Sequence, residues 1–186
     1  MSYFWYTKLP AMRQQLLFLL VLLTSCAGYY NKSRDISNKY YSLDFKETYA
    51  VLKGIGGLPG VADQEYFYPQ KFEINLPKQI KGIGIYGVTY IIEYDNEQII
   101  AINPGYQNHN KLPKIWSLKD VSEREISEIQ NYWQSRKYSM RIFDYPKISR
   151  TTRTYMNGEV TIVLFNIKHE DFESDLAFAK SFKYLD

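Results

Sequence analysis

Residues 150–167 read RTTRTYMNGEVTIVLFNI, and this stretch does most to decide the fold. An Asn-Gly pair between two extended runs, here Asn157-Gly158, is the strongest short signal of a hairpin between antiparallel strands. The second run, residues 160–165, is mostly apolar at successive positions, so it predicts a central strand that is covered on both faces. The stretch therefore predicts a sheet with protein packed against each side of it.

The first run of this hairpin, residues 150–155, is polar on both faces. A central position would bury Arg150 and Arg153, which is costly for unpaired charges. We therefore expect an edge strand, whose free backbone groups are either guarded by its charges or used to bind a partner. A two-residue turn would place Tyr155 opposite Val160. The candidate partner surface consists of Arg150, Arg153 and Tyr155.

The clearest helix prediction covers residues 122 to about 137. Ser122 followed three residues later by Glu125 matches the capping box that begins many helices. Val121 and Ile126 have the spacing of a hydrophobic staple across the same helix start. The apolar positions that follow fall on one stripe, so we expect this helix to lie on the sheet.

A second, shorter helix is expected at residues 43–53. Asp44 and Glu47 have capping-box spacing, and Gly54 is a plausible terminator. The tail from 170 to 183 also has helical spacing of apolar residues, with an alternating strand as the alternative for its last part.

The remaining elements are strands, and they set the fold class. Extended runs predict strands at residues 71–76, 83–94 and 98–103. Turn residues at 95–97 should join the last two strands into a hairpin. Together the elements predict an α+β fold, with a mostly antiparallel sheet and two or three packed helices.

Composition favours a folded chain without a nucleic-acid footprint. The 186 residues are 45% hydrophobic and 17% aromatic, which supplies enough apolar surface to offset chain entropy. The net charge of +3 includes Lys8 and Arg13, which lie in a segment that we expect to be removed. Without these two, 21 basic residues face 20 acidic ones, so the remaining chain lacks the basic excess of a nucleic-acid-binding protein.

The beginning of the chain has the pattern of a secretory signal. Residues 16–23 read LLFLLVLL, with Arg13 and Lys8 before them and small residues after them. At about 1.5 Å per residue, eight residues are too short to cross a hydrocarbon core of roughly 30 Å as a helix. The signal reading is therefore favoured over a transmembrane anchor.

The residues that follow, Leu23-Thr24-Ser25-Cys26, resemble the lipobox of bacterial lipoproteins. The resemblance implies cleavage between Ser25 and Cys26 and a membrane anchor of acyl chains, such as palmitate, on Cys26. Ala27, where an Asp would favour retention in the inner membrane, implies the outer membrane. Because no acidic run follows, we expect the periplasmic face. The translation start is either Met1 or Met12.

These signals divide the chain into three parts. Residues 1–25 are expected to form the lipoprotein signal peptide, and residues 26–40 a polar, lipidated tether. Residues 41–186 are expected to form a single domain, because no second linker interrupts them. The mature domain itself resembles no family that we recognise.

Motifs for catalysis or metal binding are scarce. Cys26 is the sole cysteine, and the two histidines, His109 and His169, read as surface residues. The acidic residues after His169 match no zinc or calcium spacing, and a helix start explains them more simply. The loop at 54–60 lacks the frame of a phosphate-binding motif. We therefore predict no metal and no cofactor, and no catalytic residue can be named.

Charge is unevenly distributed near the hairpin. Residues 136–153 hold one acidic and six basic side chains, the latter being Arg136, Lys137, Arg141, Lys147, Arg150 and Arg153. This pattern indicates either a basic surface for an anionic partner or an arginine-guarded edge facing the acidic segment 170–175.

The leading functional prediction is a non-enzymatic protein-binding module held at the envelope, because an anchor and a compact domain come without a catalytic constellation. One alternative is a lipoprotein that binds glycan or lipid, which would need a concave aromatic pocket. The other is a hydrolase that uses paired carboxylates, which would need two carboxyl groups facing each other in a cleft. An enzyme is the less favoured class.

Overall fold

A computed structural model describes residues 35–55, 71–105, 115–144 and 148–185. The predicted lipidation site at Cys26, the cleavage site after Ser25, His109 and Lys147 lie outside these residues. The described residues belong to one compact unit that begins at Asp35.

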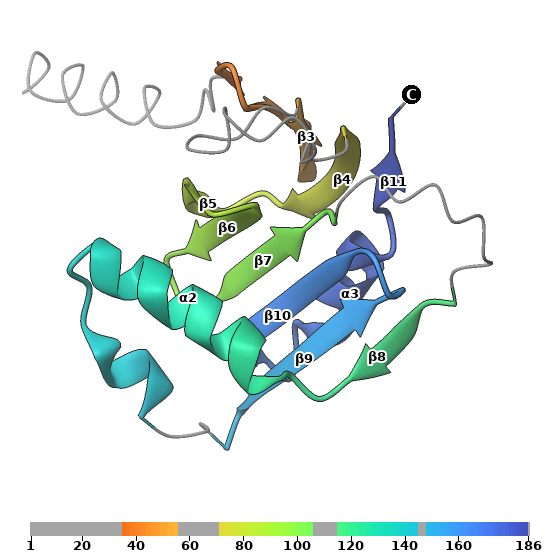
Figure 1. Cartoon of the computed structure of the whole chain (residues 1–186). Coiled ribbons are helices and arrows are strands. Elements are labelled where there is room, and N and C mark those ends of the chain that lie inside the picture. Colours follow the sequence, from red (N-terminus) through yellow and green to blue (C-terminus); the bar gives the residue numbers. More distant parts are fainter. Residues whose placement is uncertain (1–34, 56–70, 106–114, 145–147, 186) are drawn as a thin grey trace, which may run out of the picture. The chain divides into compact units, whose positions relative to one another are not determined.

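Two antiparallel sheets form the framework of the described chain (Figure 1). The first sheet has the order β1-β2-β3-β4-β11 and the second has the order β5-β6-β7-β10-β9-β8. The strands of the first sheet are β1 (Ile36–Ser37), β2 (Tyr41–Phe45), β3 (Tyr49–Gly54), β4 (Phe72–Pro77) and β11 (Lys183–Tyr184). Those of the second are β5 (Ile80–Tyr86), β6 (Thr89–Tyr94), β7 (Ile99–Asn103), β8 (Ser117–Lys119), β9 (Arg150–Met156) and β10 (Thr161–Lys168). β1 lies in the stretch that the sequence indicates as a tether.

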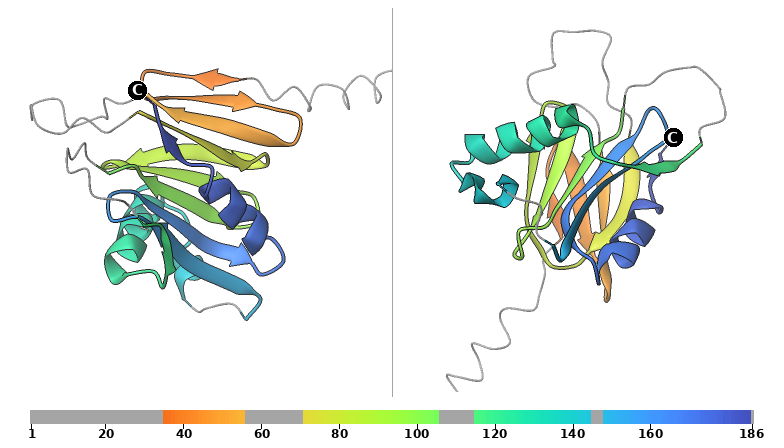
Figure 2. Two further views of the ribbon diagram at one scale, coloured as in Figure 1. Left: turned by 90° about the vertical axis from the view of Figure 1, so that its right-hand side faces the viewer. Right: turned by 90° about the horizontal axis from the view of Figure 1, so that it is seen from below.

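Within the described ranges, three helical elements accompany the sheets: α2 (Glu123–Ser135), the 3-10 helix η1 (Met140–Phe143) and α3 (Phe172–Ala179). Figure 1 shows α2 crossing one face of the six-stranded sheet. The two further views place the five-stranded sheet on the opposite face (Figure 2). The predicted α+β class with mostly antiparallel strands is therefore confirmed.

Apolar side chains fill both spaces between these layers. The larger cluster joins the two sheets and α3, and Leu52, Ile74 and Ile162 are fully buried in it. The smaller cluster joins the other face of the six-stranded sheet to α2 and η1, and it contains Ile129 and Val163. β10 contributes to both clusters, so the prediction of a central strand covered on two faces is confirmed.

The helix predicted for residues 43–53 is wrong, because this segment forms the hairpin of β2 and β3. Glu47, expected in a capping box, lies in the turn between these strands, where the Lys46 amide donates to the Tyr49 carbonyl (2.8 Å). Tertiary pairing overrides the local helical signal here, since β3 also pairs with β4 along its whole length.

The extended run at 83–94 is likewise two strands rather than one. β5 and β6 are joined by a tight turn at Gly87, whose φ of 59° lies in the left-handed region that glycine adopts without strain. The predicted hairpin of β6 and β7 around residues 95–97 is confirmed.

The hairpin of β9 and β10 is present, but its register differs from the prediction by two residues. Met156 faces Thr161 and Tyr155 faces Ile162, so the loop contains four residues instead of two. The Asn157 side-chain oxygen accepts hydrogen bonds from the amides of Glu159 (3.0 Å) and Val160 (2.8 Å). These bonds favour the wider turn, and a shift of two residues leaves each side chain on its predicted face.

β9 is not the edge strand that its charges predicted. The short strand β8 pairs with Thr154, Tyr155 and Met156 and forms the sheet edge instead. Because β8 has only three residues, the half of β9 that carries Arg150 and Arg153 is not paired with it. The two arginines are therefore half-buried, without the cost that full burial would carry.

The helix predictions for residues 122 to about 137 and for the first part of the tail agree with the structure. Ser122 and Glu125 form the predicted capping box at the start of α2. In the tail, α3 takes the first part, and the alternative strand appears as β11 in the last. Glu173 and Asp175 lie in the first turn of α3, where the helix dipole favours acids.

Candidate functional site

The three residues of the predicted partner surface all make contacts within the domain. Arg153 forms an ion pair with Asp120, just after β8. Arg150 donates from Nη1 to the Asn166 carbonyl (2.9 Å), at a bulge of β10. Tyr155 stacks on Trp116, with ring centroids 4.5 Å apart. All three residues therefore lie on β9, and each of them contacts a neighbouring segment of the domain.

The acidic residues of the β6–β7 hairpin are separated by the structure. Glu93 is buried, and its carboxylate accepts a hydrogen bond from the hydroxyl of Tyr132 on α2. Asp95 and Glu97 lie in the turn and are exposed. Strand alternation thus directs Glu93 alone toward the helical layer. His169 is exposed beside the start of α3, as its sequence context indicates.

A cavity of about 360 Å³ lies between the N-terminal half of α2 and the six-stranded sheet; we call it the α2 cavity. Its volume falls within the range of about 300–1,000 Å³ typical of ligand pockets. Its lining comprises Thr89, Ala101, Asn103, Gly105, Ser122, Arg124, Glu125, Glu128, Ile129, Gly158, Glu159, Thr161 and Val163.

The floor of the α2 cavity is apolar and made by the sheet and one helix residue. Ala101 on β7 and Val163 on β10 are direct cross-strand neighbours, and both face α2. Ile129 closes the inner side from the helix. Because the side chains of alanine and valine are short, they leave space between the sheet and the start of α2.

Glu125 is held at the cavity by the helix cap. Its Oε2 accepts hydrogen bonds from the Ser122 amide (2.7 Å), the Ser122 hydroxyl (2.9 Å) and the hydroxyl of Thr154 on β9 (3.0 Å). Its Oε1 accepts none from the residues that the structure describes. The capping box therefore fixes one carboxylate oxygen and leaves the other available.

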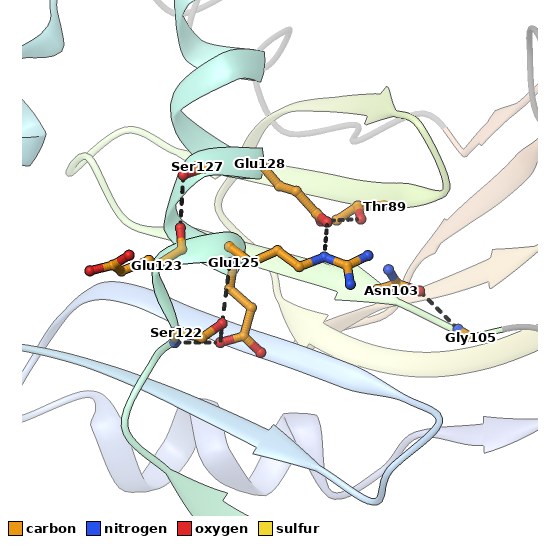
Figure 3. Close-up of polar contacts among 9 residues, drawn as sticks. Thr89, Asn103, Gly105, Ser122, Glu123, Glu125, Ser127 and Glu128 are labelled. Atoms are coloured by element: carbon orange, nitrogen blue, oxygen red, sulfur yellow. Dashed lines mark hydrogen bonds and ion pairs between the residues drawn. The ribbon is translucent and has the colours of Figure 1, made fainter.

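Glu128 lies one turn further along α2, and its carboxylate contacts Thr89 and Arg124 (Figure 3). Its Oε2 accepts a hydrogen bond from the Thr89 hydroxyl (3.0 Å), and its Oε1 lies 3.5 Å from Nε of Arg124. The Arg124 side chain is 87% exposed, so this ion pair is a weak one. Arg124 shows that the Glu128 carboxylate can accept a guanidinium group in this position.

The charges around the α2 cavity are mostly negative. Its lining holds three carboxylates, from Glu125, Glu128 and Glu159, and one cation, from Arg124. Burial and the neighbouring Glu159 carboxylate raise the pKa of the Tyr184 hydroxyl. A negative rim above an apolar floor suits a ligand with a cationic head and a carbon stem.

The α2 cavity lacks the aromatic lining that the glycan- or lipid-binding alternative would need. Its described lining includes no aromatic side chain on which a sugar ring could stack. Of its residues, the sequence pointed to Ser122 and Glu125 as cap residues and to Gly158 as a turn residue. The available signal was the spacing of Glu125 and Glu128, which places both on one face of a helix.

Comparisons with known proteins do not identify a relative. No protein-family model, no curated protein and no solved structure matches this chain. Among the described residues, no helix has the length and apolar character needed to cross a membrane.

Proposed function

We propose that this protein is an envelope lipoprotein whose domain is a non-enzymatic protein-binding module, and that the α2 cavity receives a basic side chain of the partner. The single observation that supports the proposal is the cavity itself, with its carboxylate rim and apolar floor. The anchor part is supported by the lipobox-like residues at Cys26, and we propose the periplasmic face of the outer membrane as the location of the domain.

A lysine or arginine side chain fits the chemistry of the α2 cavity at both of its ends. Its methylene stem would cover Ile129 and Val163, and its charged head would reach the carboxylates of Glu125 and Glu128. The head would displace Arg124, at little cost because that side chain is largely exposed. The positive end of the α2 dipole is already offset by the capping carboxylate.

The test is a titration of the full chain, in detergent micelles, with Nα-acetyl-arginine amide and Nα-acetyl-lysine amide. We expect saturable amide shifts in α2 and around Gly158, and no such shifts with the neutral analogue Nα-acetyl-citrulline amide. Glu128→Gln should weaken binding by about tenfold, since a charge-assisted hydrogen bond contributes about 1.5–3 kcal/mol.

The control is Glu123→Gln, which removes the same charge from an exposed position in the first turn of the same helix. Binding by this variant should equal that of the natural chain. If citrulline binds as well as arginine, or if Glu123→Gln and Glu128→Gln behave alike, the α2 cavity is not a site for basic side chains.

The anchor is tested separately, by metabolic labelling with palmitate. Cys26→Ser should abolish the label and leave unprocessed precursor, because the thioether requires the cysteine thiol. If the Ser variant is still cut after Ser25 and released in soluble form, an ordinary signal peptidase processes the chain and the lipoprotein assignment fails.

A further inference from the structure

A second cavity, of about 380 Å³, lies at the other end of β7; we call it the α3 cavity. There the start of α3 meets the β2–β3 and β6–β7 hairpin turns and the connection between β4 and β5. It is separate from the α2 cavity, and no residue lines both. Its lining comprises Thr48, Pro77, Lys78, Gln79, Tyr94, Asp95, Asn96, Gln98, Asp171, Ser174, Asp175 and Phe178.

The charged groups of the α3 cavity are unbalanced. Asp95, Asp171 and Asp175 supply three carboxylates, against the one ammonium group of Lys78. Lys78 donates to the backbone carbonyl of Glu47 (3.2 Å) and makes no ion pair with the described residues. The positive end of the α3 dipole offsets only about half of one charge, so the cavity remains negative.

Asp175 is the central residue of this arrangement. Its side chain lines the cavity although the residue is only 6% exposed, and it accepts no hydrogen bond from any described group. Buried carboxyl groups in proteins are normally paired or hydrogen-bonded, because desolvation of an isolated one is costly. Burial and the neighbouring Asp171 raise the pKa of Asp175 to about 6. The described chain therefore supplies no partner for this carboxyl group.

Tyr94 is a second polar residue of the α3 cavity whose side chain lacks a partner among the described residues. The residue lines the cavity and is 6% exposed, and its buried hydroxyl has no hydrogen-bond partner within the described chain. Burial raises the pKa of this hydroxyl well above its usual value, and Asp175 contributes to the increase. The Tyr94 hydroxyl and the Asp175 carboxyl group therefore lie near each other.

The spacing of the acids indicates the size of the cation. Within the described ranges, no three His, Cys, Asp or Glu side chains are close enough to hold a metal ion. A calcium ion would need six to eight oxygens at about 2.3–2.6 Å. A polyatomic cation bridges more widely spaced carboxylates, and Pro77 and Phe178 provide apolar walls for its carbon atoms.

We propose that the α3 cavity binds small organic ammonium ions, held between the carboxylates of Asp175 and Asp171 at the start of α3. Asp171 is already oriented for this, because its Oδ2 accepts a hydrogen bond from Gln98 (3.3 Å), which Asn96 holds in turn (2.6 Å). The titratable groups that line the cavity with Asp175 are Asp171 at the N-cap of its helix, Tyr94 at the end of β6, and Lys78 and Asp95 from the adjoining turns. Asp175 must be ionised to hold the cation, so binding depends on pH.

The experiment is a titration of the isotope-labelled full chain, in detergent micelles, with n-butylammonium chloride. We expect saturable shifts at Asn96, Ser174 and Asp175, with affinity about tenfold lower at about pH 5 than at about pH 7.5. Asp175→Asn, which keeps the shape of the side chain, should abolish these shifts. Glu173→Gln, which removes an exposed charge from the same helix turn, should leave them unchanged.

Four results would overturn the proposal. Equal binding of n-butanol would show that the cavity recognises the alkyl chain and not the positive charge of the ligand. Undiminished binding by folded Asp175→Asn would remove the carboxylate from the site. Stronger competition by calcium chloride than by butylammonium would make the site a metal site. A lack of saturation by millimolar amine would mean that water fills the cavity and no ligand is held.

Discussion

The hydroxyl of Tyr132 donates a hydrogen bond to the buried carboxylate of Glu93, and this bond joins α2 to the sheet it covers. Both residues are nearly inaccessible, with 4% and 3% of their surface exposed. Burial and the carboxylate raise the pKa of the Tyr132 hydroxyl, so it remains a donor throughout the physiological range. The position of α2, and with it the α2 cavity, therefore depends on one polar contact as well as on apolar packing.

Tyr132→Phe should lower the free energy of unfolding by about 2–3 kcal/mol, because a buried carboxyl group would lose its donor. Urea denaturation followed by circular dichroism measures the change. Tyr138→Phe is the matched control, since its ring packs on Trp133 at 4.7 Å and the hydroxyl interacts with exposed Arg136. We expect the control to lie within about 0.5 kcal/mol of the natural chain. Equal losses in the two variants would mean that the Glu93 contact contributes nothing particular.

Gly84 on β5 lies directly beneath the Tyr132 ring, and a Cβ atom there would collide with the ring carbons and the hydroxyl. Gly84→Ala should therefore displace Tyr132 from Glu93 and cost about 1–3 kcal/mol, the usual range for overpacking. Gly82→Ala is the control, because its Cβ would find only Glu93 at 3.9 Å. Thermal melting should show a loss for the first variant alone; an intact melting temperature in Gly84→Ala would contradict this packing.

Local signals in the sequence located the parts of the fold that depend on neighbouring residues. The capping box at Ser122 and Glu125 involves a single helix turn, and the structure contains it as predicted. The turn at Asn157-Gly158 was located too, but its register was not. The choice between two and four loop residues depends on the bonds that the Asn157 side chain makes.

Contacts between distant segments were beyond such reasoning. The three-residue strand β8 has too little sequence to give a periodic signal, yet it removes Tyr155 from the sheet edge. Residues 43–53 looked helical because the partners that make them strands are β4 and β1, which nothing local reveals. The two cavities follow the same rule. Asp95 and Asp175 are far apart in the chain. They line the same cavity because the turn between β6 and β7 lies beside α3 in the fold.

The two arginines of β9 should differ in their effect on stability. Arg150→Ala removes the donor to the carbonyl of Asn166, a buried residue held in the left-handed region (φ 57°), so we expect a loss of about 1–2 kcal/mol. Arg153→Ala breaks an ion pair whose side chains are 42% and 89% exposed, so we expect about 0–1 kcal/mol. Urea denaturation of both variants under one condition measures the difference.

This difference also decides how the predicted partner surface should be tested. Arg153→Glu should keep the fold, so a weaker capture of envelope proteins by that variant would report on the surface itself. The same result with Arg150→Glu would report on the bulge of β10. If Arg153→Ala proves as damaging as Arg150→Ala, the ion pair with Asp120 is an internal part of the fold and β9 offers no free charge to a partner.

Asp175 should make the stability of the folded domain depend on pH. Its pKa is about 6 in the folded chain and 3.8 as the ordinary value, so the folded state binds this proton more tightly than the unfolded state does. The contribution to stability is therefore complete below about pH 4 and is lost as the pH rises through about 6. A difference of this size corresponds to about 2–3 kcal/mol. Asn does not titrate, so the advantage of Asp175→Asn over the natural chain should grow by that amount between about pH 4 and about pH 7. Urea denaturation across this range measures the advantage, and Glu173→Gln, changed at an exposed acid of the same helix turn, should show a nearly constant difference. A constant difference for Asp175→Asn as well would mean that the Asp175 carboxyl group is not desolvated in the folded chain. In that case its burial could not be what prepares the α3 cavity for a cation.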